Sequence, residues 1–431
     1  MPECVCQYDP RAQTEDNQIM SLTRTQSSLA AWILALLVAA PLFGAHPVGV
    51  DDLQTFAPAD LSTYGGGYRA NEGPFFSFDA MVWWIEKPDI ALIGDATTRQ
   101  VVINSITGID LDGDGTIDVY PTPVKATEFS THDTGAYYSE ETPGQRYEFG
   151  YVEGHHGLLC SIYQMGEQNL DFMASDAHVV FQDSPFGALG FQHLQGFIDT
   201  DLTLVDDLPV RFDYLTASYQ VRTWGVELNY LHRSHPFHHG GIFELFLGAR
   251  YLQFDDSFFV EGLEVISVDG DPASGLGDSA WYTESENHIV GPQIGFRWYR
   301  KCGRWTWSTE GRGFAGFNSQ DITQWGYLGN ELDPENAGLL QIRNMQPTSF
   351  DHKKNFDEFS PGVELRLDCK YQVTRSITVG AGWTVFWLDN IARSPGLVQY
   401  TIAQDSLMGI GNDNDESVFM HGVHGRLEWN R

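Results

Sequence analysis

The residues best suited to chemistry are charged side chains that recur at every second position. In the segment 359–374, FSPGVELRLDCKYQVT, acidic and basic residues alternate with apolar ones. Successive side chains of a strand point to opposite faces, so these charges gather on one face. Opposed acids and bases on an inward face would line an aqueous channel and set its ion preference. The candidates for this pore-lining role are Glu227, Glu244, Arg250, Arg297, Glu310, Arg312, Glu364, Arg366, Asp368 and Lys370.

The same charges allow a second interpretation, in which they pair with one another and fill the interior. Barrels of about eight to ten strands leave little free bore, whereas wider ones open a channel. About twelve strands would lie between these cases. The sequence leaves an open and a plugged lumen equally possible.

A second group of acidic residues has the spacing of a calcium loop. In DLDGDGTID, Asp110, Asp112, Asp114 and Asp118 occupy the first, third, fifth and ninth positions of such a loop. The twelfth position is Pro121, so the usual bidentate acid is missing. A solvated turn rich in Asp and Gly is the simpler alternative. We expect no cofactor, with Ca²⁺ at this loop as the alternative.

Two groups of histidines are also close in sequence. His155 and His156 form one group, and the other comprises His232, His235, His238 and His239. Imidazoles at this density can bind zinc or copper, but a polar turn is the favoured interpretation.

The elements that would position these residues are β-strands. Polar–apolar alternation recurs over 76–86, 222–231, 243–253, 288–300, 304–317, 376–389 and 419–429, and more weakly over 146–153, 157–166, 177–183 and 210–220. A strand with one apolar and one polar face is typical of outer-membrane barrels. We therefore predict an all-β fold, an antiparallel transmembrane up-and-down β-barrel of about 12 strands (range 10–16). A soluble secreted β-sandwich, with its tryptophans packed in the core, is the alternative.

The connections between these strands are of two kinds. Short turns are predicted at 301–303 and 374–375, and long external loops that carry much of the acidic excess at 86–145, 261–287, 318–358 and 390–416. Short periplasmic turns and long external loops are usual in this class of barrel.

Composition excludes several classes of function. With 25 basic and 58 acidic residues, a net charge of -33, the chain would repel nucleic acid. The five cysteines have no spacing that indicates a disulfide framework. No nucleophile elbow, phosphate loop, dinucleotide fingerprint or zinc-protease motif is present, so we assign no catalytic residue and expect no enzyme.

The N-terminal region has the pattern of an export signal. Arg24 precedes an apolar run over 29–40, and small residues follow. We predict a signal peptide in 1–45 with the true start at Met20, a linker over 46–74 and a barrel over 75–431.

Five segments resemble a known family: FSFDAMVWWIEKP, YQVRTWGVELNYLHR, GPQIGFRWYR, FSPGVELRLDCKYQVTRSITVGAGWTVFWLDNIARSP and HGVHGRLEWNR. They are similar to the putative β-barrel porin family seven of planctomycete bacteria. The resemblance implies an outer-membrane β-barrel of porin type and brings no catalytic residues. In one departure from many outer-membrane barrels, Trp429 is followed by Asn430 and Arg431.

We therefore expect a barrel in the cell outer membrane that contacts its lipid and lets small solutes diffuse through, with a weak preference for cations because the rim is acidic. The alternative is a non-conducting barrel that acts as a surface or adhesion scaffold with a calcium-stabilised loop.

Overall fold

The computed structural model describes residues 72–95, 100–103, 124–127, 130–183, 197–199, 207–237, 240–263, 278–328, 348–403 and 406–430. No helix among them is long and apolar enough to cross a bilayer. The predicted signal peptide and nearly all of the predicted linker lie outside these ranges.

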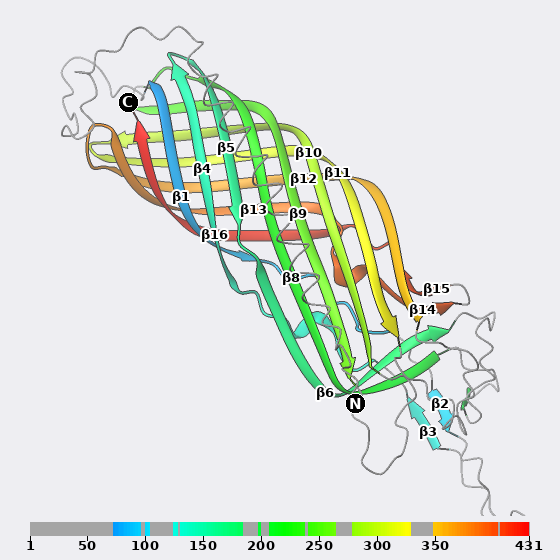
Figure 1. Cartoon of the computed structure of the whole chain (residues 1–431). Coiled ribbons are helices and arrows are strands. Elements are labelled where there is room, and N and C mark those ends of the chain that lie inside the picture. The colour runs from blue at the N-terminus through cyan, green and yellow to red at the C-terminus, as the bar shows by residue number, and fades with distance from the viewer. Residues whose placement is uncertain are drawn as a thin grey trace, which may run out of the picture. The chain divides into compact units, whose positions relative to one another are not determined.

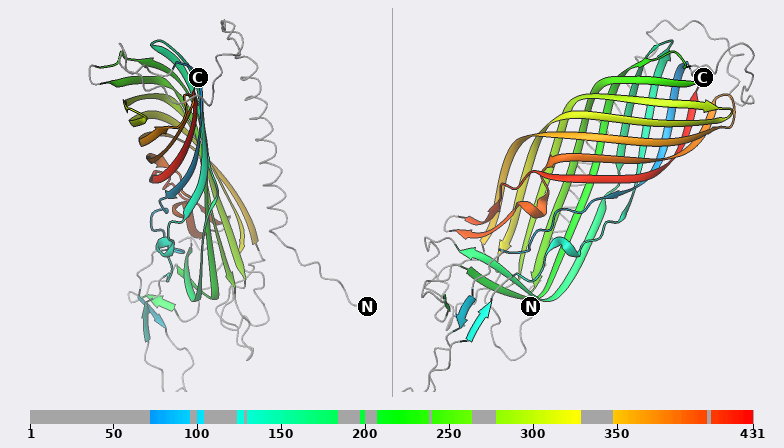
Figure 2. Two further views of the ribbon diagram at one scale, coloured as in Figure 1. Left: turned by 90° about the vertical axis from the view of Figure 1, so that its left-hand side faces the viewer. Right: turned by 180° about the vertical axis from the view of Figure 1, so that it is seen from behind.

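The described residues form a closed ring of ten antiparallel strands (Figures 1 and 2). Each strand pairs with two neighbours, and the ring closes because β1 pairs with both β4 and β16 while β9 pairs with both β8 and β10. The all-β barrel prediction is confirmed, with a strand number at the lower end of the predicted range. In chain order the ring contains β1 (Gly73–Ile85), β4 (Glu141–Glu153), β5 (His156–Met165), β8 (Asp207–Arg233), β9 (Gly241–Leu263), β10 (Ser279–Cys302), β11 (Trp305–Leu328), β12 (Thr348–Gln372), β13 (Ile377–Ile391) and β16 (Glu416–Asn430).

The remaining elements are not strands of this ring. Strand β6 (Gln168–Asp183) continues β5 along β8, and the hairpin of β14 (Val398–Ala403) and β15 (Ser406–Ile410) pairs with β6. A separate sheet contains β2 (Gln100–Ile103), β3 (Val124–Thr127) and β7 (Phe197–Asp199). Two short 3-10 helices, η3 (Thr134–Ala136) and η4 (Ser394–Leu397), complete the described elements.

One side of the barrel is much taller than the other. Strands β8 to β12 have 23 to 27 residues, about twice what a tilted strand needs to cross a membrane. Two predicted loops, 261–287 and 318–358, were therefore too long, because 279–287, 318–328 and 348–358 are strand. The sequence pattern missed these extensions because their outward side chains are polar, as with Glu284 and Glu286 on β10.

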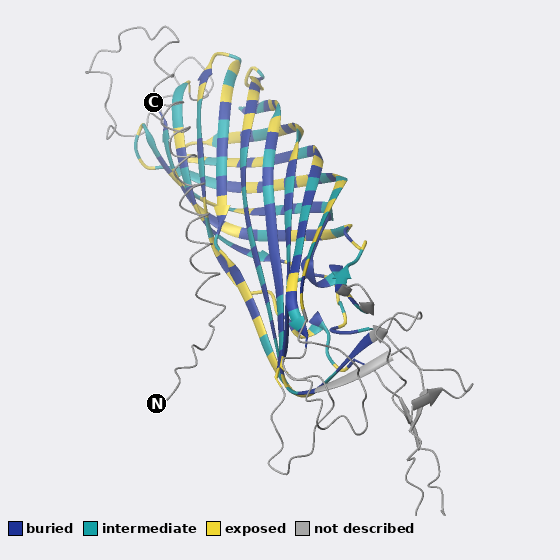
Figure 3. Ribbon diagram, turned by 45° about the vertical axis from the view of Figure 1, so that its right-hand side comes forward, coloured by how far each residue is buried: buried dark blue, intermediate teal, exposed yellow. Residues whose placement is uncertain are grey.

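The two faces of the wall differ as the alternation predicted (Figure 3). On β12, the outward side chains of Val363 and Leu365 are 44% and 49% exposed. Arg366, on the opposite face of the same strand, is 1% exposed. Outward apolar side chains on the other strands continue this surface around the ring, which is the pattern of a lipid-facing band. They include Leu158, Leu228, Leu245, Leu247, Val290, Ile294, Phe296, Val379, Trp383, Val423 and Leu427.

Candidate functional site: ion pairs across the lumen

Strand register places acids beside bases on the inner wall. Glu310 lies opposite Arg366 in the pairing of β11 with β12, and Glu227 lies opposite Arg250 in the pairing of β8 with β9. Opposite charges on facing positions stabilise a sheet, and like charges there destabilise it. The alternation within each strand thus produces a layer in which the two signs are interleaved.

Several ion pairs of this layer cross the barrel. Arg366 of β12 donates from Nη1 to Oε1 of Glu148 on β4 over 2.5 Å, and Arg146 of β4 donates to Glu364 of β12 over 3.2 Å. Strands β1, β16 and β13 separate β4 from β12 in the ring. Opposite walls are therefore joined directly through their side chains.

A third contact spans the full width of the ring. The Nη2 atom of Arg312 on β11 lies 3.7 Å from Oε1 of Glu148 on β4. Four strands separate β4 from β11 in either direction around the ring. Glu148 thus joins two bases of the far wall at one point of the lumen.

The charges of this layer are withdrawn from solvent. The side chains of Arg312, Glu148, Glu364 and Arg366 are each no more than 3% exposed. Removing charges from water costs several kcal/mol per ion unless each is paired and hydrogen-bonded. The interleaved layer meets this requirement, because Glu364 accepts from Arg146, Arg250 and Arg366.

Aromatic rings cover the layer. The guanidinium carbon of Arg250 lies 5.1 Å from the ring centre of Phe314 and 5.3 Å from that of Phe386. These two rings are nearly parallel, with centres 6.2 Å apart. A cation close to aromatic rings is stabilised by their electrons. This stabilisation compensates Arg250 for the hydrogen-bond partners that its Nε and Nη1 atoms lack.

Part of the connection from β13 to β16 also lies against the inner wall of the barrel. We call residues 390–397 the plug segment. Asn287 on β10 brackets it, because its Nδ2 donates to the carbonyl of Ala392 and its Oδ1 accepts from the Ala392 N–H, both at 2.9 Å. Ser360 on β12 donates to the carbonyl of Asn390 over 2.7 Å. The plug segment is therefore fixed to the inner wall by side chains of two strands.

A buried ion pair anchors the same segment to a third strand. Arg393 donates from Nε to Asp256 of β9 over 2.9 Å, and both side chains are fully buried. Arg393 also donates to the hydroxyl of Tyr219 on β8, and Asp256 accepts from the backbone N–H of Ser394 over 2.9 Å. This part of the predicted loop 390–416 thus lies inside the barrel, not in solvent.

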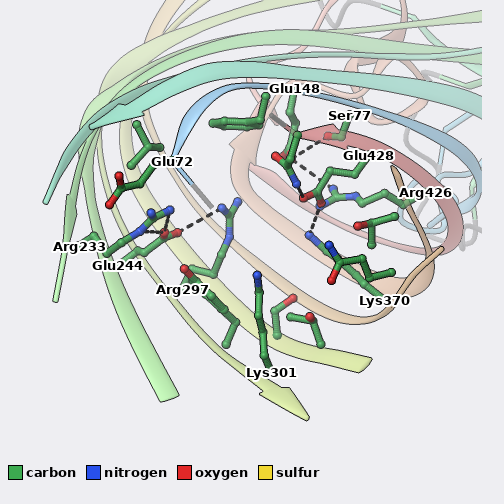
Figure 4. A pocket seen from close by; sticks show the side chains of 18 of the residues that line it. Glu72, Ser77, Glu148, Arg233, Glu244, Arg297, Lys301, Lys370, Arg426 and Glu428 are labelled. Carbon is green, nitrogen blue, oxygen red and sulfur yellow. Dashed lines mark hydrogen bonds and ion pairs between the residues drawn. The ribbon is translucent and has the colours of Figure 1, made fainter. Parts of the chain in front are cut away.

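A small cavity lies on the other side of the charged layer (Figure 4). Its volume is about 100 Å³, and Glu148 and Arg426 belong to its wall. The first residue of β1, Gly73, and the penultimate residue of the chain, Asn430, also line it. The short turns after β4, β10 and β12 lie at this end of the strands, which is the periplasmic end of such barrels. We call this cavity the periplasmic vestibule.

All ten residues predicted to line a pore lie in the interior. Those nearest the vestibule are also paired, Asp368 with His424 and Lys370 with Glu428, each at 2.7 Å. Ion pairs join the other eight to one another, whereas Asp368 and Lys370 pair with residues outside the predicted set. Whether solutes pass between them stays a prediction.

Sequence reasoning missed other members of the same network. They occupy inward-facing positions of strands that the alternation did identify, so the sequence indicated the direction of their side chains. It did not indicate which residues pair across the ring. The missed residues are Asp79, Arg146, Glu148, Arg233, Arg426 and Glu428.

The structure describes part of the predicted histidine site and none of the predicted calcium site. Asp110, Asp112, Asp114 and Asp118 lie outside the described residues. The rings of His155 and His235 are 4.1 Å apart between centres, but His238 and His239 are outside the described part. Among the residues that the structure describes, no three His, Cys, Asp or Glu side chains are arranged to hold a metal ion.

Several solved structures are similar to the chain at low sequence identity. The outer membrane protease OmpT of Escherichia coli matches with a TM-score of 0.39 and 9% identity over 84% of this chain and 98% of that protein. The CymD monoaromatic hydrocarbon channel matches with a TM-score of 0.29 and 7% identity, over 84% and 89%. A FadL homologue of Pseudomonas aeruginosa has a TM-score of 0.24 and 8% identity, over 87% and 95%.

No match was found among curated protein sequences. The model of one family, described as "Putative beta barrel porin-7", matches residues 75–415. This range covers most of the chain and includes the inner charged layer and the plug segment. The chain belongs to this beta-barrel porin family of the outer membrane.

Proposed function

We propose that the protein is an outer-membrane scaffold whose barrel is closed to solutes. It would hold its tall wall and external connections at the cell surface. The observation that carries this proposal is the set of ion pairs that join opposite walls through Glu148, Glu364 and Arg366, at exposures of 3% or less.

Opening the lumen would require the separation of buried charges. Charges that line an aqueous channel are hydrated, whereas these have exchanged water for one another. Separating a buried pair leaves uncompensated charges and costs about 3–5 kcal/mol when one partner is lost. A passage would also have to remove the plug segment, which Asp256 and Asn287 hold in place.

Passive diffusion of small solutes is the second candidate. Membership of a porin family favours it, as do buried nitrogen atoms of Arg146, Arg312 and Arg366 that lack hydrogen-bond partners. Such atoms are satisfied by internal water in many proteins. The weak preference for cations belongs to this candidate and rests on the net charge of -33.

Two further features belong to the scaffold proposal. The family assignment points to a role without catalysis. Calcium bound by Asp110, Asp112, Asp114 and Asp118 would stiffen an external connection. Melting of the full chain in Ca²⁺ and in chelator tests this, with a higher Tm in Ca²⁺ expected and equal Tm values contradicting it.

Liposome swelling distinguishes the two candidates. Vesicles that contain the folded protein are diluted into small sugars and amino acids, with an open general porin in parallel. The scaffold proposal predicts swelling no faster than that of protein-free vesicles. Swelling that depends on solute size would favour passive diffusion instead.

A further inference from the structure

The periplasmic vestibule is rich in basic groups in a chain that is poor in them. The chain has 25 basic and 58 acidic residues. The lining of the vestibule contains more bases than acids, because Glu72, Glu148, Glu244 and Glu428 are its only acids. Its five bases are Arg233, Arg297, Lys301, Lys370 and Arg426. The lining thus has a small excess of basic groups, in contrast to the whole chain.

Three of these bases converge on one space. Figure 4 shows Lys301 extending between Arg297 on one side and Lys370 on the other. Lys370 gives one hydrogen bond to Glu428 over 2.7 Å. An ammonium group has three N–H donors, so Lys370 can also donate to a molecule in the cavity.

Two of the four acids of the vestibule, Glu148 and Glu244, are paired with arginines, and Glu428 is paired with Lys370. Glu244 accepts from Arg233 over 2.7 Å and from Arg297 over 3.3 Å. Glu148 lies within 3.7 Å of Arg312, Arg366 and Arg426. Carboxylates held in this way have little capacity left for a cation, whereas each lysine ammonium group has three N–H donors.

We propose that the periplasmic vestibule binds a small oxyanion, a phosphate or a carboxylate, through Lys301, Lys370 and Arg297. Ammonium and guanidinium groups make strong charge-assisted hydrogen bonds to such oxygens. A volume of about 100 Å³ holds one phosphate-sized ion with some of its water. The inference goes beyond the closed scaffold, because the cavity opens on the periplasmic side of the charged layer and needs no passage through it.

Calorimetry on the full chain in detergent micelles tests this site. Inorganic phosphate is titrated at fixed ionic strength, and acetate is used as the carboxylate probe. We expect saturable binding of at least one of them. Lys301→Gln should weaken it about tenfold or more, because a charge-assisted hydrogen bond is lost, and Lys301→Arg should retain most of it.

Matched controls keep the test independent of folding and of conductance. Lys353→Gln removes a basic group from the outward face of β12, far along the strand from Lys370, and should leave binding unchanged. Each variant is checked for wild-type melting before titration. Absence of saturable binding to both probes, or wild-type affinity in the folded Lys301→Gln/Lys370→Gln variant, would overturn the proposal. Neither outcome depends on whether the barrel conducts.

Discussion

Arg366 on β12 and Glu148 on β4 form an ion pair 2.5 Å long across the lumen, with side-chain exposures of 1% and 3%. Arg366 also contacts Glu364 of its own strand, with Nε and Oε1 2.7 Å apart. One guanidinium thus links two walls of the barrel.

Removing one partner of this pair should destabilise the barrel more than the loss of one buried side chain would by itself. Arg366→Met leaves Glu148 and Glu364 each without one of their bases, and we expect a loss of about 3–5 kcal/mol. Urea unfolding of the protein in lipid vesicles measures it. Adding Glu148→Leu to Arg366→Met should recover part of the loss, and a double variant whose loss equals the sum of the two single losses would contradict the proposed coupling.

Strand β13, which pairs with β12, has a glycine where the inward charges need space. A Cβ atom on Gly382 would lie 2.5 Å from Oδ1 of Asp368 and 2.6 Å from the ring of His424. Gly382→Val should therefore displace the Asp368–His424 pair and cost about 1–3 kcal/mol.

Gly425 supplies the control, because a Cβ there meets no atom within 4 Å. Gly425→Ala should stay within about 0.5 kcal/mol of wild type, as for most surface changes. Equal melting temperatures for Gly382→Val and Gly425→Ala would show that the inner wall is not closely packed at this point.

The plug segment should be released when its buried anchor is removed. Arg393→Met leaves Asp256 buried without its base, so we expect faster hydrogen exchange over 390–397 and a loss of about 3–5 kcal/mol. Arg375→Met, in the exposed turn after β12, is the control and should change neither. Unchanged exchange over 390–397 in Arg393→Met would contradict the anchoring role.

Glu416 should make stability fall as pH rises. Glu416 is the first residue of β16 and precedes Phe419, the first exposed apolar residue of that strand. Its side chain accepts a hydrogen bond from the backbone N–H of Asp89 over 3.0 Å. Burial raises the pKa of Glu416 to about 7 from an ordinary value near 4.5. Between these values the folded state binds more protons at Glu416 than the unfolded chain does, so the contribution of Glu416 to stability is greatest below pH 4.5 and declines up to about pH 7.

The contribution of Glu416 is at most about 3 kcal/mol, at about 1.4 kcal/mol per pH unit. It is measured as the difference in pH dependence between wild type and Glu416→Gln. A Glu416→Gln variant that loses stability with pH as steeply as wild type would refute it.

The sequence predicts the wall of this barrel better than its interior. Alternation over 359–374 correctly places Leu365 outside and Arg366 inside, because a strand has a period of two. It cannot pair Arg366 with Glu148, since that contact joins residues 218 apart across the ring. The same limit applies to Arg393, whose inward position depends on Asp256 and not on its neighbours in sequence.

Strand ends were predictable only inside the membrane band. Val290 and Ile294 alternate with polar residues and identify β10, but Glu284 and Glu286 are outward and polar, so the pattern ends before the strand does. Above the membrane, backbone pairing with β9 and β11 maintains the strand without an apolar outer face.

Conductance of single barrels in a planar lipid bilayer tests the central claim, that ion pairs between β4 and β12 close the lumen. Folded wild-type protein, checked by its heat-dependent shift in gel mobility, is inserted in parallel with an open general porin. The closed lumen predicts no conductance steps from the wild type under conditions in which the porin gives them. Reproducible steps of fixed size from the wild-type protein would contradict it.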